Sequence, residues 1–358
     1  MTDNSSFITF VLGAGSSFEV DMPTGEKLKS NIAAALTFKP DQFGRVTGGD
    51  DQIREALHQL EQGNQAAEER GRYGIAAGLI CAGMPQAPSI DNFIDSHRSN
   101  PQVAEIGKLA IASEILKAER TSKLYVSPTN IYNKMDFHRL ANSWFHSFWQ
   151  LLTLNAQEED LPERLQRVRV VSFNYDRTLE HFLFYSIQNY YGSSAERAAE
   201  ILKHLIVLHP YGKVGNLPWQ NEGVPVPFGG DMHHSVLLQV ANGLRTFTEG
   251  TSKTGSQIES IRSAVFDAEI LTFLGFAYHE LNLALLFDAP TSASTRHKKQ
   301  VFGTAMGLSE SNKKAIADEL ASRGRYELSQ ITLRRELSAA QLLPEYSRSL
   351  RIPGPTIP

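Results

Sequence analysis

The sequence predicts an α/β protein built on a doubly wound, parallel β-sheet. Three observations support this fold class: short apolar runs recur along the chain, helical patterns separate them, and several of the runs end in glycine or polar residues. Strands that alternate with helices form parallel sheets whose two faces are covered by those helices. In such sheets, ligands bind outside the carboxyl ends of the strands.

The first strand is expected at residues 7–12, FITFVL, because all six residues are apolar or favour strands. The turn GAGSS follows at residues 13–17. Thr24 is then the expected N-cap of a helix over residues 26–36, where leucine and isoleucine recur at helical spacing. A strand that runs through a glycine-rich turn into a helix is typical of phosphate binding, since backbone N–H groups can approach the anion.

The next part of the chain predicts almost only helix. Apolar spacing indicates helices at residues 52–78, 103–117 and 135–154, with a loop at 38–51 and with Ser89 or Asp91 as a helix cap. The apolar stripe of 135–154 is expected to belong to the core. We therefore expect a large all-helical insertion over residues 31–164.

The second half of the chain returns to alternating strands and helices. Strands are expected at 168–173, 206–208, 269–274 and 299–304, and helices at 178–190, 258–266, 281–287 and 311–323. Residues 213–231 and 246–256 predict loops, and 353–358 a frayed proline-rich end. The expected organisation is a discontinuous α/β domain at 1–30 and 165–345, the insertion between them, and a C-terminal tail at 346–358.

The composition allows a large core and argues against several classes of protein. The chain has 358 residues, 41% of them hydrophobic, and a net charge of -4, which gives no general attraction to nucleic acid or to an anionic membrane. The single cysteine, Cys81, excludes a disulfide framework within the chain and a zinc site built from several cysteines. Small apolar neighbours predict that Cys81 is a buried structural thiol and not a nucleophile.

The sequence also predicts a cytoplasmic protein with no membrane contact. No segment reaches the roughly 18 consecutive apolar residues of a membrane-spanning helix. The N-terminal residues MTDNSS are polar, unlike a signal peptide.

Polar or glycine residues stand at the carboxyl ends of four predicted strands: residues 13–17, residues 174–176, His209 and residues 275–276. They are expected to meet at one edge of the sheet. The dehydrogenase fingerprint G-x-G-x-x-G is incomplete, because Phe18 occupies its third glycine position. The SKT at 252–254 lacks the glycines of a phosphate-binding Walker loop and predicts a solvated linker.

The motifs GAGSS, FNYD, LHPYG and LGFAYHE together resemble the sirtuin-like domains of bacterial anti-phage defence proteins, which are distant relatives of the NAD-dependent sirtuin deacylases. The resemblance covers about residues 5–30 and 165–345, and residues 89–94, SIDNFI, resemble a segment often seen in the insertion. It implies a Rossmann-like sheet and a catalytic pair, Asn174 and His209. The residues that it implies for NAD binding are Gly13, Ala14, Gly15, Ser16, Ser17, Thr24, Asp176, Gly275, Phe276 and Tyr278.

The sequence departs from this family in two places, and the first departure favours hydrolysis of NAD over deacylation. The deacylases carry a four-cysteine zinc ribbon, which one cysteine cannot build, so no metal is expected and water takes the place of acyl-lysine. The family has glycine directly after the histidine, whereas here Pro210 and Tyr211 precede Gly212. The expected activity is cleavage of NAD⁺ to nicotinamide and ADP-ribose.

The resemblance implies a defence role in which the enzyme depletes NAD⁺ during infection. Activation is expected from self-assembly into a homo-oligomer, a small nucleotide signal, or a partner protein such as a HerA-type ATPase. The alternatives are a non-catalytic module that binds NAD or ADP-ribose, and an NAD-dependent protein deacylase. Each residue also has a structural alternative: residues 174–176 form an ordinary turn, His209 is a core histidine, and Phe276 and Tyr278 only pack.

Overall fold

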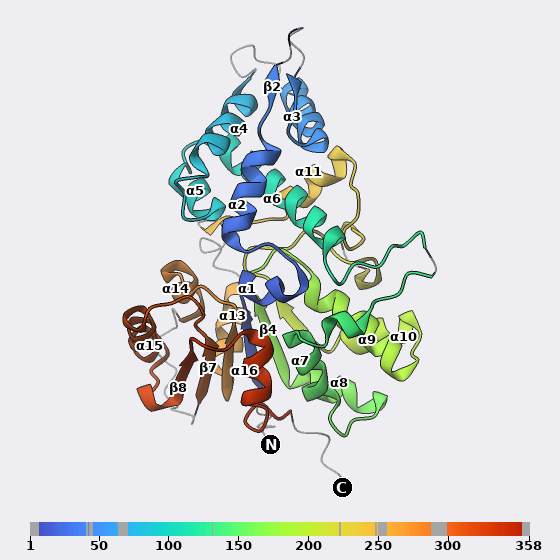
Figure 1. Ribbon diagram of the computed structural model, residues 1–358, viewed down its shortest axis with the longest axis vertical. Helices are drawn as coiled ribbons and strands as arrows, with labels where there is room; N and C mark the ends of the chain where they lie inside the picture. Colours follow the sequence, from blue (N-terminus) through green and yellow to red (C-terminus); the bar gives the residue numbers. More distant parts are fainter. Residues whose placement is uncertain are drawn as a thin grey trace.

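Six parallel strands form the central sheet of the computed structural model (Figure 1). Along the sheet they are ordered β5-β4-β1-β6-β7-β8. Their bounds are β1 Ile8–Leu12, β4 Val168–Ser172, β5 Ile206–Leu208, β6 Ile270–Leu274, β7 Gln300–Thr304 and β8 Ile331–Arg334. When the six are renumbered along the chain, the order is 3-2-1-4-5-6, that of a Rossmann-type sheet, so the predicted fold class is confirmed.

The structure describes residues 7–40, 42, 46–63, 71–130, 132–221, 223–247, 249, 256–287 and 299–352. The predicted linker segment 252–254 and the predicted frayed end 353–358 lie outside the described residues.

Helices cover both faces of the sheet because successive strand residues point to opposite sides. Thr9 of β1 donates from Oγ1 to the carbonyl oxygen of Ala264 in α13 (Ser256–Phe266) at 2.5 Å. On the other face, the ring of Phe10 meets that of Phe148 in α7 (Trp144–Thr153), with centroids 5.2 Å apart. The other helices that accompany the sheet are α8 Leu161–Gln166, α9 Thr178–Tyr191, α10 Ala195–Leu202, α14 Glu280–Phe287, α15 Glu310–Gly324 and α16 Ala339–Glu345.

A second group of helices, which we call the helical lobe, stands above the carboxyl edge of the sheet in Figure 1. Its members are α2 Gly25–Ala35, α3 Asp51–Gly63, α4 Arg72–Gly83, α5 Ile90–Ser96, α6 Pro101–Thr121 and α11 His234–Asn242. Helix α6 lies at its centre and contacts the other five. Helix α7, within the predicted insertion, instead packs against α8, α9 and α16. The predicted insertion boundaries stay a prediction.

Several predicted elements differ from the structure. Strand β8 was not predicted, because ITLR is short and only Leu333 is fully buried. The predicted loop 38–51 contains the two-residue strands β2 (Lys39–Pro40) and β3 (Val46–Thr47).

Two long predicted helices are wrong in extent. The predicted helix 52–78 is replaced by α3 and α4, and Gly71, with φ 82°, stands immediately before α4. The predicted helix 135–154 is a 3₁₀ turn, Phe137–Leu140, followed by α7. Ser143 separates the two with extended backbone, and its hydroxyl donates to the Leu140 carbonyl at 2.7 Å. Serine bonds made to nearby backbone in this way compete with a helix.

The predicted caps are confirmed. Ser89 Oγ accepts from the backbone N–H of Asn92 at 3.0 Å, and Thr24 Oγ1 accepts from that of Lys27 at 3.5 Å. Cys81 is only partly buried, and its thiol contacts the Ala33 carbonyl and the Thr37 hydroxyl.

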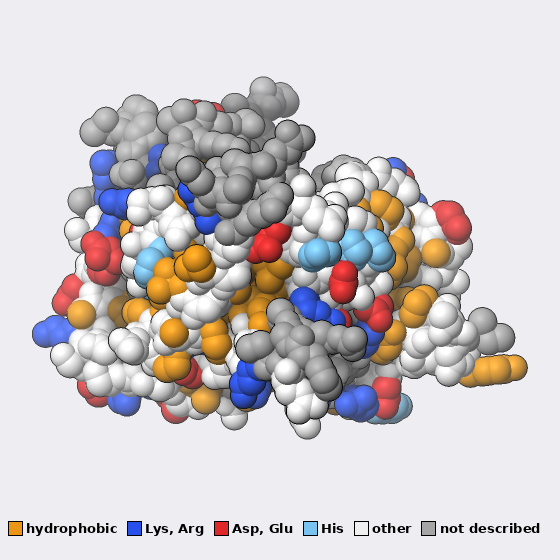
Figure 2. All heavy atoms as spheres, turned by 90° about the horizontal axis from the view of Figure 1, so that it is seen from above, with side chains coloured by type: hydrophobic (Ala, Val, Ile, Leu, Met, Phe, Trp, Pro, Cys, Tyr) orange, Lys and Arg blue, Asp and Glu red, His pale blue; other side chains and the backbone are white. Residues whose placement is uncertain are grey.

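On the face seen in Figure 2, acidic and basic side chains are interspersed and neither sign dominates. This distribution agrees with the small net charge of -4. Among the described helices, none combines the length and apolar character needed to cross a membrane.

Candidate active site

The glycine turn after β1 and the end of β6 are in direct backbone contact. The N–H of Gly15 donates to the carbonyl oxygen of Gly275 at 3.0 Å. A Cβ on Gly13 would stand 2.6 Å from that oxygen, and a Cβ on Gly275, whose φ is 56°, would stand 2.0 Å from the Ser16 nitrogen. These glycines are therefore required for the close approach of two strand ends, at the point where the strand order reverses.

Asn174, which follows β4, joins this junction through its side chain. Its amide Nδ2 donates to the Gly13 carbonyl oxygen at 3.1 Å and to Ser17 Oγ at 3.0 Å. The side chain is 7% exposed. Within the described part of the chain, no donor bonds to its amide oxygen Oδ1, and this oxygen is not fully buried. That oxygen is thus available to accept from a hydroxyl or a water.

Asp176 organises the start of α9. Its Oδ1 accepts from the Thr178 backbone N–H at 3.1 Å and from the Thr178 hydroxyl at 2.6 Å. The Thr178 hydroxyl also lies 3.2 Å from that of Ser17. Burial, together with the charge of Glu119, raises the pKa of Asp176 above its ordinary value, although the bonds from Thr178 oppose the shift. The glycine turn and the FNYD segment are thus linked by hydroxyl contacts.

His209, at the end of β5, contacts an acceptor on each side of its ring. Nδ1 lies 3.2 Å from the carbonyl oxygen of Asn174, and Nε2 lies 3.1 Å from Oε1 of Glu180 in α9. Lys213 Nζ reaches the same Glu180 oxygen at 3.3 Å. Burial alone would raise the pKa of Glu180, but the charge of Lys213 and the bond with His209 hold that pKa well below its usual range. The structure thus brings Asn174 and His209 together.

Three other predicted site residues, Phe276, Tyr278 and Thr24, make packing or capping contacts. Phe276 and Tyr278 are each 5% exposed. Phe276 packs with Phe173, Tyr278 packs with Phe273, and the Tyr278 hydroxyl donates to the Thr304 carbonyl at 3.1 Å. Thr24, apart from capping α2, borders a cavity of about 360 Å³ between α2 and α6.

A buried ion pair that the sequence did not predict fixes the FNYD segment to the helical lobe. Arg177 and Glu119 of α6 are both fully buried, with Arg177 Nη2 2.5 Å from Glu119 Oε2. The Glu119 carboxylate also accepts from the backbone N–H groups of Arg177 at 3.2 Å and of Gly229 at 2.9 Å. Arg177 in turn donates to the Val226 carbonyl at 2.6 Å.

A second missed contact joins Tyr175 to the SIDNFI segment. The Tyr175 hydroxyl donates to a carboxylate oxygen of Asp91 in α5. Burial raises the pKa of Asp91, while the bond from Tyr175 and the nearby His279 oppose that shift. The lobe is therefore held to the motif by two contacts, one from each residue that flanks Asp176.

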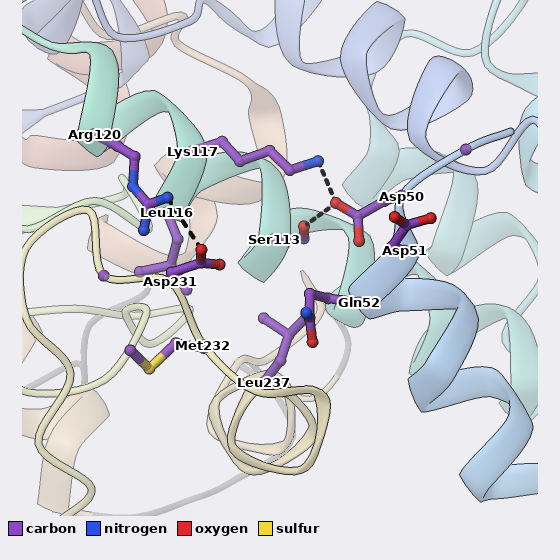
Figure 3. A pocket seen from close by; sticks show the side chains of 12 residues that line it. Asp50, Asp51, Gln52, Ser113, Leu116, Lys117, Arg120, Asp231, Met232 and Leu237 are labelled. Carbon is purple, nitrogen blue, oxygen red and sulfur yellow. Dashed lines mark hydrogen bonds and ion pairs between the residues drawn. The ribbon is translucent and has the colours of Figure 1, made fainter.

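Figure 3 shows a cavity of about 340 Å³ between the start of α3, α6 and the loop before α11. Two ion pairs lie in its lining, Lys117 with Asp50 and Arg120 with Asp231 at 3.4 Å, and the Ser113 hydroxyl donates to Asp50. Neither Asn174 nor His209 borders it. The cavity is therefore separate from the candidate active site.

No protein-family model matches this chain, and a search of curated proteins gives no match. Among the described residues, no group of three or more His, Cys, Asp or Glu side chains could hold a metal ion.

Proposed function

We propose that this protein is an NAD⁺ glycohydrolase that releases nicotinamide and ADP-ribose. The observation that carries the proposal is the contact between His209 and Asn174 at the sheet edge, beside the glycine turn. The His209 ring contacts the backbone of Asn174, and the Asn174 amide reaches the glycine turn at the topological switch point. This arrangement suits a reaction that activates a water or ribose hydroxyl.

The leaving group needs no acid in this reaction. Nicotinamide in NAD⁺ is cationic, and its departure neutralises the ring, so the protein must tolerate an oxocarbenium-like sugar and supply a nucleophile. His209 would accept the proton, Asn174 would hold the water or ribose through Oδ1, and Asp176 would face the carboxamide.

The resemblance to defence proteins extends the proposal to a bacterial NAD-depleting effector. A homo-oligomeric state or a partner such as a HerA-type ATPase would control it.

The test is NAD⁺ consumption by the purified chain, alone and with candidate partners, with chromatography of nicotinamide and ADP-ribose. His209→Gln and Asn174→Ala are each expected to lower the rate by about 10²–10⁴-fold. His146→Gln is the matched control, because this residue of α7 contacts Gln150 through its ring, and it is expected to leave the rate unchanged. NAD⁺ that binds to the wild type but is never consumed under any activating condition would contradict the proposal. That result would favour the non-catalytic binding module.

A further inference from the structure

We propose that the cavity between α2 and α6 is a binding site for a mononucleotide. The cavity has a volume of about 360 Å³, which lies within the range of small-molecule sites. Neither Asn174 nor His209 borders it, so the inference goes beyond the proposed NAD⁺ cleavage and does not depend on it. Three side chains of its wall carry the inference: Phe18, Lys27 and Asn31.

Phe18 supplies an exposed aromatic ring to the wall of the cavity. Its exposed fraction is 60%, whereas Phe276 and Tyr278, the aromatic residues expected at the NAD site, are each 5% exposed. A nucleobase can stack on an accessible ring, and such stacking tolerates any base because every base has a π-face. Met22 and Ala118 add apolar groups to the same wall. The cavity therefore suits a flat, largely apolar ring.

Among the described residues, the charged side chains of the wall leave Lys27 as the cation available to a ligand. These side chains are two carboxylates and two lysines: Asp21, Glu114, Lys27 and Lys117. Glu114 pairs with Lys117 at 2.7 Å, and Asp21 pairs with Lys123 at 3.3 Å. Lys117 is held by Asp50 as well. Lys27 is exposed, and no carboxylate in the described part of the chain pairs with it. A phosphate at Lys27 would gain a charge-assisted hydrogen bond.

Asn31 adds a polar group one helical turn after Lys27. Residues four apart in a helix lie on the same face, so both side chains belong to one side of α2. No hydrogen bond from the described residues engages the Asn31 amide, which borders the cavity. An amide offers donors and an acceptor, and the edge of a nucleobase presents the same two kinds of group. Asn31 can therefore bind the edge of the base while Lys27 binds the phosphate.

A mononucleotide is a ligand that uses all three groups at once. An inorganic phosphate would contact only Lys27, and an uncharged aromatic ring would contact only Phe18 and Asn31. The bound nucleotide would also touch the segment 18–24, which joins the glycine turn to α2. Asp21 of this segment is already tied to Lys123, which follows α6. Occupancy is therefore expected to hold the glycine turn and the helical lobe together and to raise the melting temperature.

Isothermal titration calorimetry of the full chain with AMP tests the proposal, with adenosine and ribose 5-phosphate as partial ligands. AMP is expected to bind at least about tenfold more tightly than either, since each lacks one of the contacts. Phe18→Leu keeps an apolar side chain without a ring and should weaken AMP binding by about 5–100-fold. Lys27→Met removes the charge and should weaken AMP binding by about tenfold or more, with adenosine binding unchanged. Tyr132→Leu and Lys314→Met, at exposed positions outside the cavity, are the matched controls and should bind AMP like the wild type.

The variants also locate the bound AMP, because the proposed NAD⁺ site would accept an AMP moiety as well. No AMP binding, or binding to Phe18→Leu and Lys27→Met as tight as to the wild type, would overturn the proposal. Melting curves without ligand show that the variants fold, and little change is expected because both side chains are exposed. Saturating AMP should raise the melting temperature of the wild type more than that of either variant. Absence of nicotinamide release from the wild type would instead overturn the proposed function, and AMP binding in this cavity would still stand.

Discussion

Replacement of Glu119 by glutamine should strongly destabilise the protein, because Glu119 anchors Arg177 in the interior. Both side chains are fully buried, and the carboxylate accepts from Arg177 Nη2 at 2.5 Å and from the Gly229 N–H at 2.9 Å through the same oxygen. In Glu119→Gln, an NH₂ group that faces these two donors would replace that oxygen. Arg177 would keep its charge in the interior with only backbone carbonyls and one amide oxygen as partners.

The size of the effect follows from these contacts. A hydrogen bond to a charged group contributes about 1.5–3 kcal/mol, and two such bonds are lost. The removal of one partner from a buried ion pair costs about 3–5 kcal/mol in other proteins, which is the same range. We therefore expect Glu119→Gln to lower the free energy of unfolding by about 3–5 kcal/mol. Adding Arg177→Met should reduce this loss, since it removes the unpaired charge.

Urea unfolding followed by tryptophan fluorescence measures the free energy for the wild type, both single variants and the double variant. Glu200→Gln removes an exposed pair with Lys203 and should leave the free energy of unfolding nearly unchanged. A loss below about 1 kcal/mol in Glu119→Gln, or losses in the double variant that simply add, would refute the reasoning.

Three further predictions concern the site and its surroundings. Gly275→Ala should lower the melting temperature sharply, because its Cβ would collide with backbone, whereas Gly25→Ala, with open space, should not; thermal unfolding compares the two. Tyr175→Phe should cost about 1–3 kcal/mol, because it leaves the Asp91 carboxylate without its donor; urea unfolding measures the loss and hydrogen exchange should locate it in α5. Burial and the charge of Arg177 lower the pKa of His181 to about 3. At a pH below the pKa of this histidine in the unfolded chain, only the unfolded chain binds the proton, so the free energy of unfolding decreases as the pH is lowered. About 2 kcal/mol should be lost between pH 7 and pH 5, and His181→Gln should lose less over the same interval in urea unfolding.

The strands and the residues at their ends could be predicted from the sequence because both are local features. The run FITFVL and the β-branched run before Asn174 mark buried strands whatever their neighbours. Because parallel strands end at one edge, the convergence of Asn174 and His209 also followed without any knowledge of the strand order.

The partners of these residues could not be predicted, since each comes from a distant part of the chain. Glu180 lies 29 residues from His209, Glu119 lies 58 from Arg177, and Asp91 lies 84 from Tyr175. One local feature did indicate a partner. Glu180 is a charged residue in the apolar helix that begins at Thr178, and a carboxylate buried there needs a partner. Strand β8 was missed for another reason: it is a half-exposed edge strand with little apolar sequence.

The glycine turn shows how one pattern can serve two physical purposes. The sequence indicated a backbone that approaches phosphate, and the structure adds that Gly13 and Gly15 already approach Gly275 closely. A side chain at these positions would push β1 away from β6, so the glycines are needed for the fold whether or not a ligand binds.

The order of the strands also determines when the sheet can form during synthesis. Among the six strands of the sheet, β1 is synthesised first, yet its neighbours begin only at Val168 and Ile270. The chain must therefore close two very long loops before β1 is paired, and such closure slows folding. Apart from α11, the helices of the lobe lie between β1 and β4, so they can pack around α6 before β1 is paired. Until β1 is paired, its five apolar or β-forming residues stay exposed, and an exposed apolar strand is prone to aggregate.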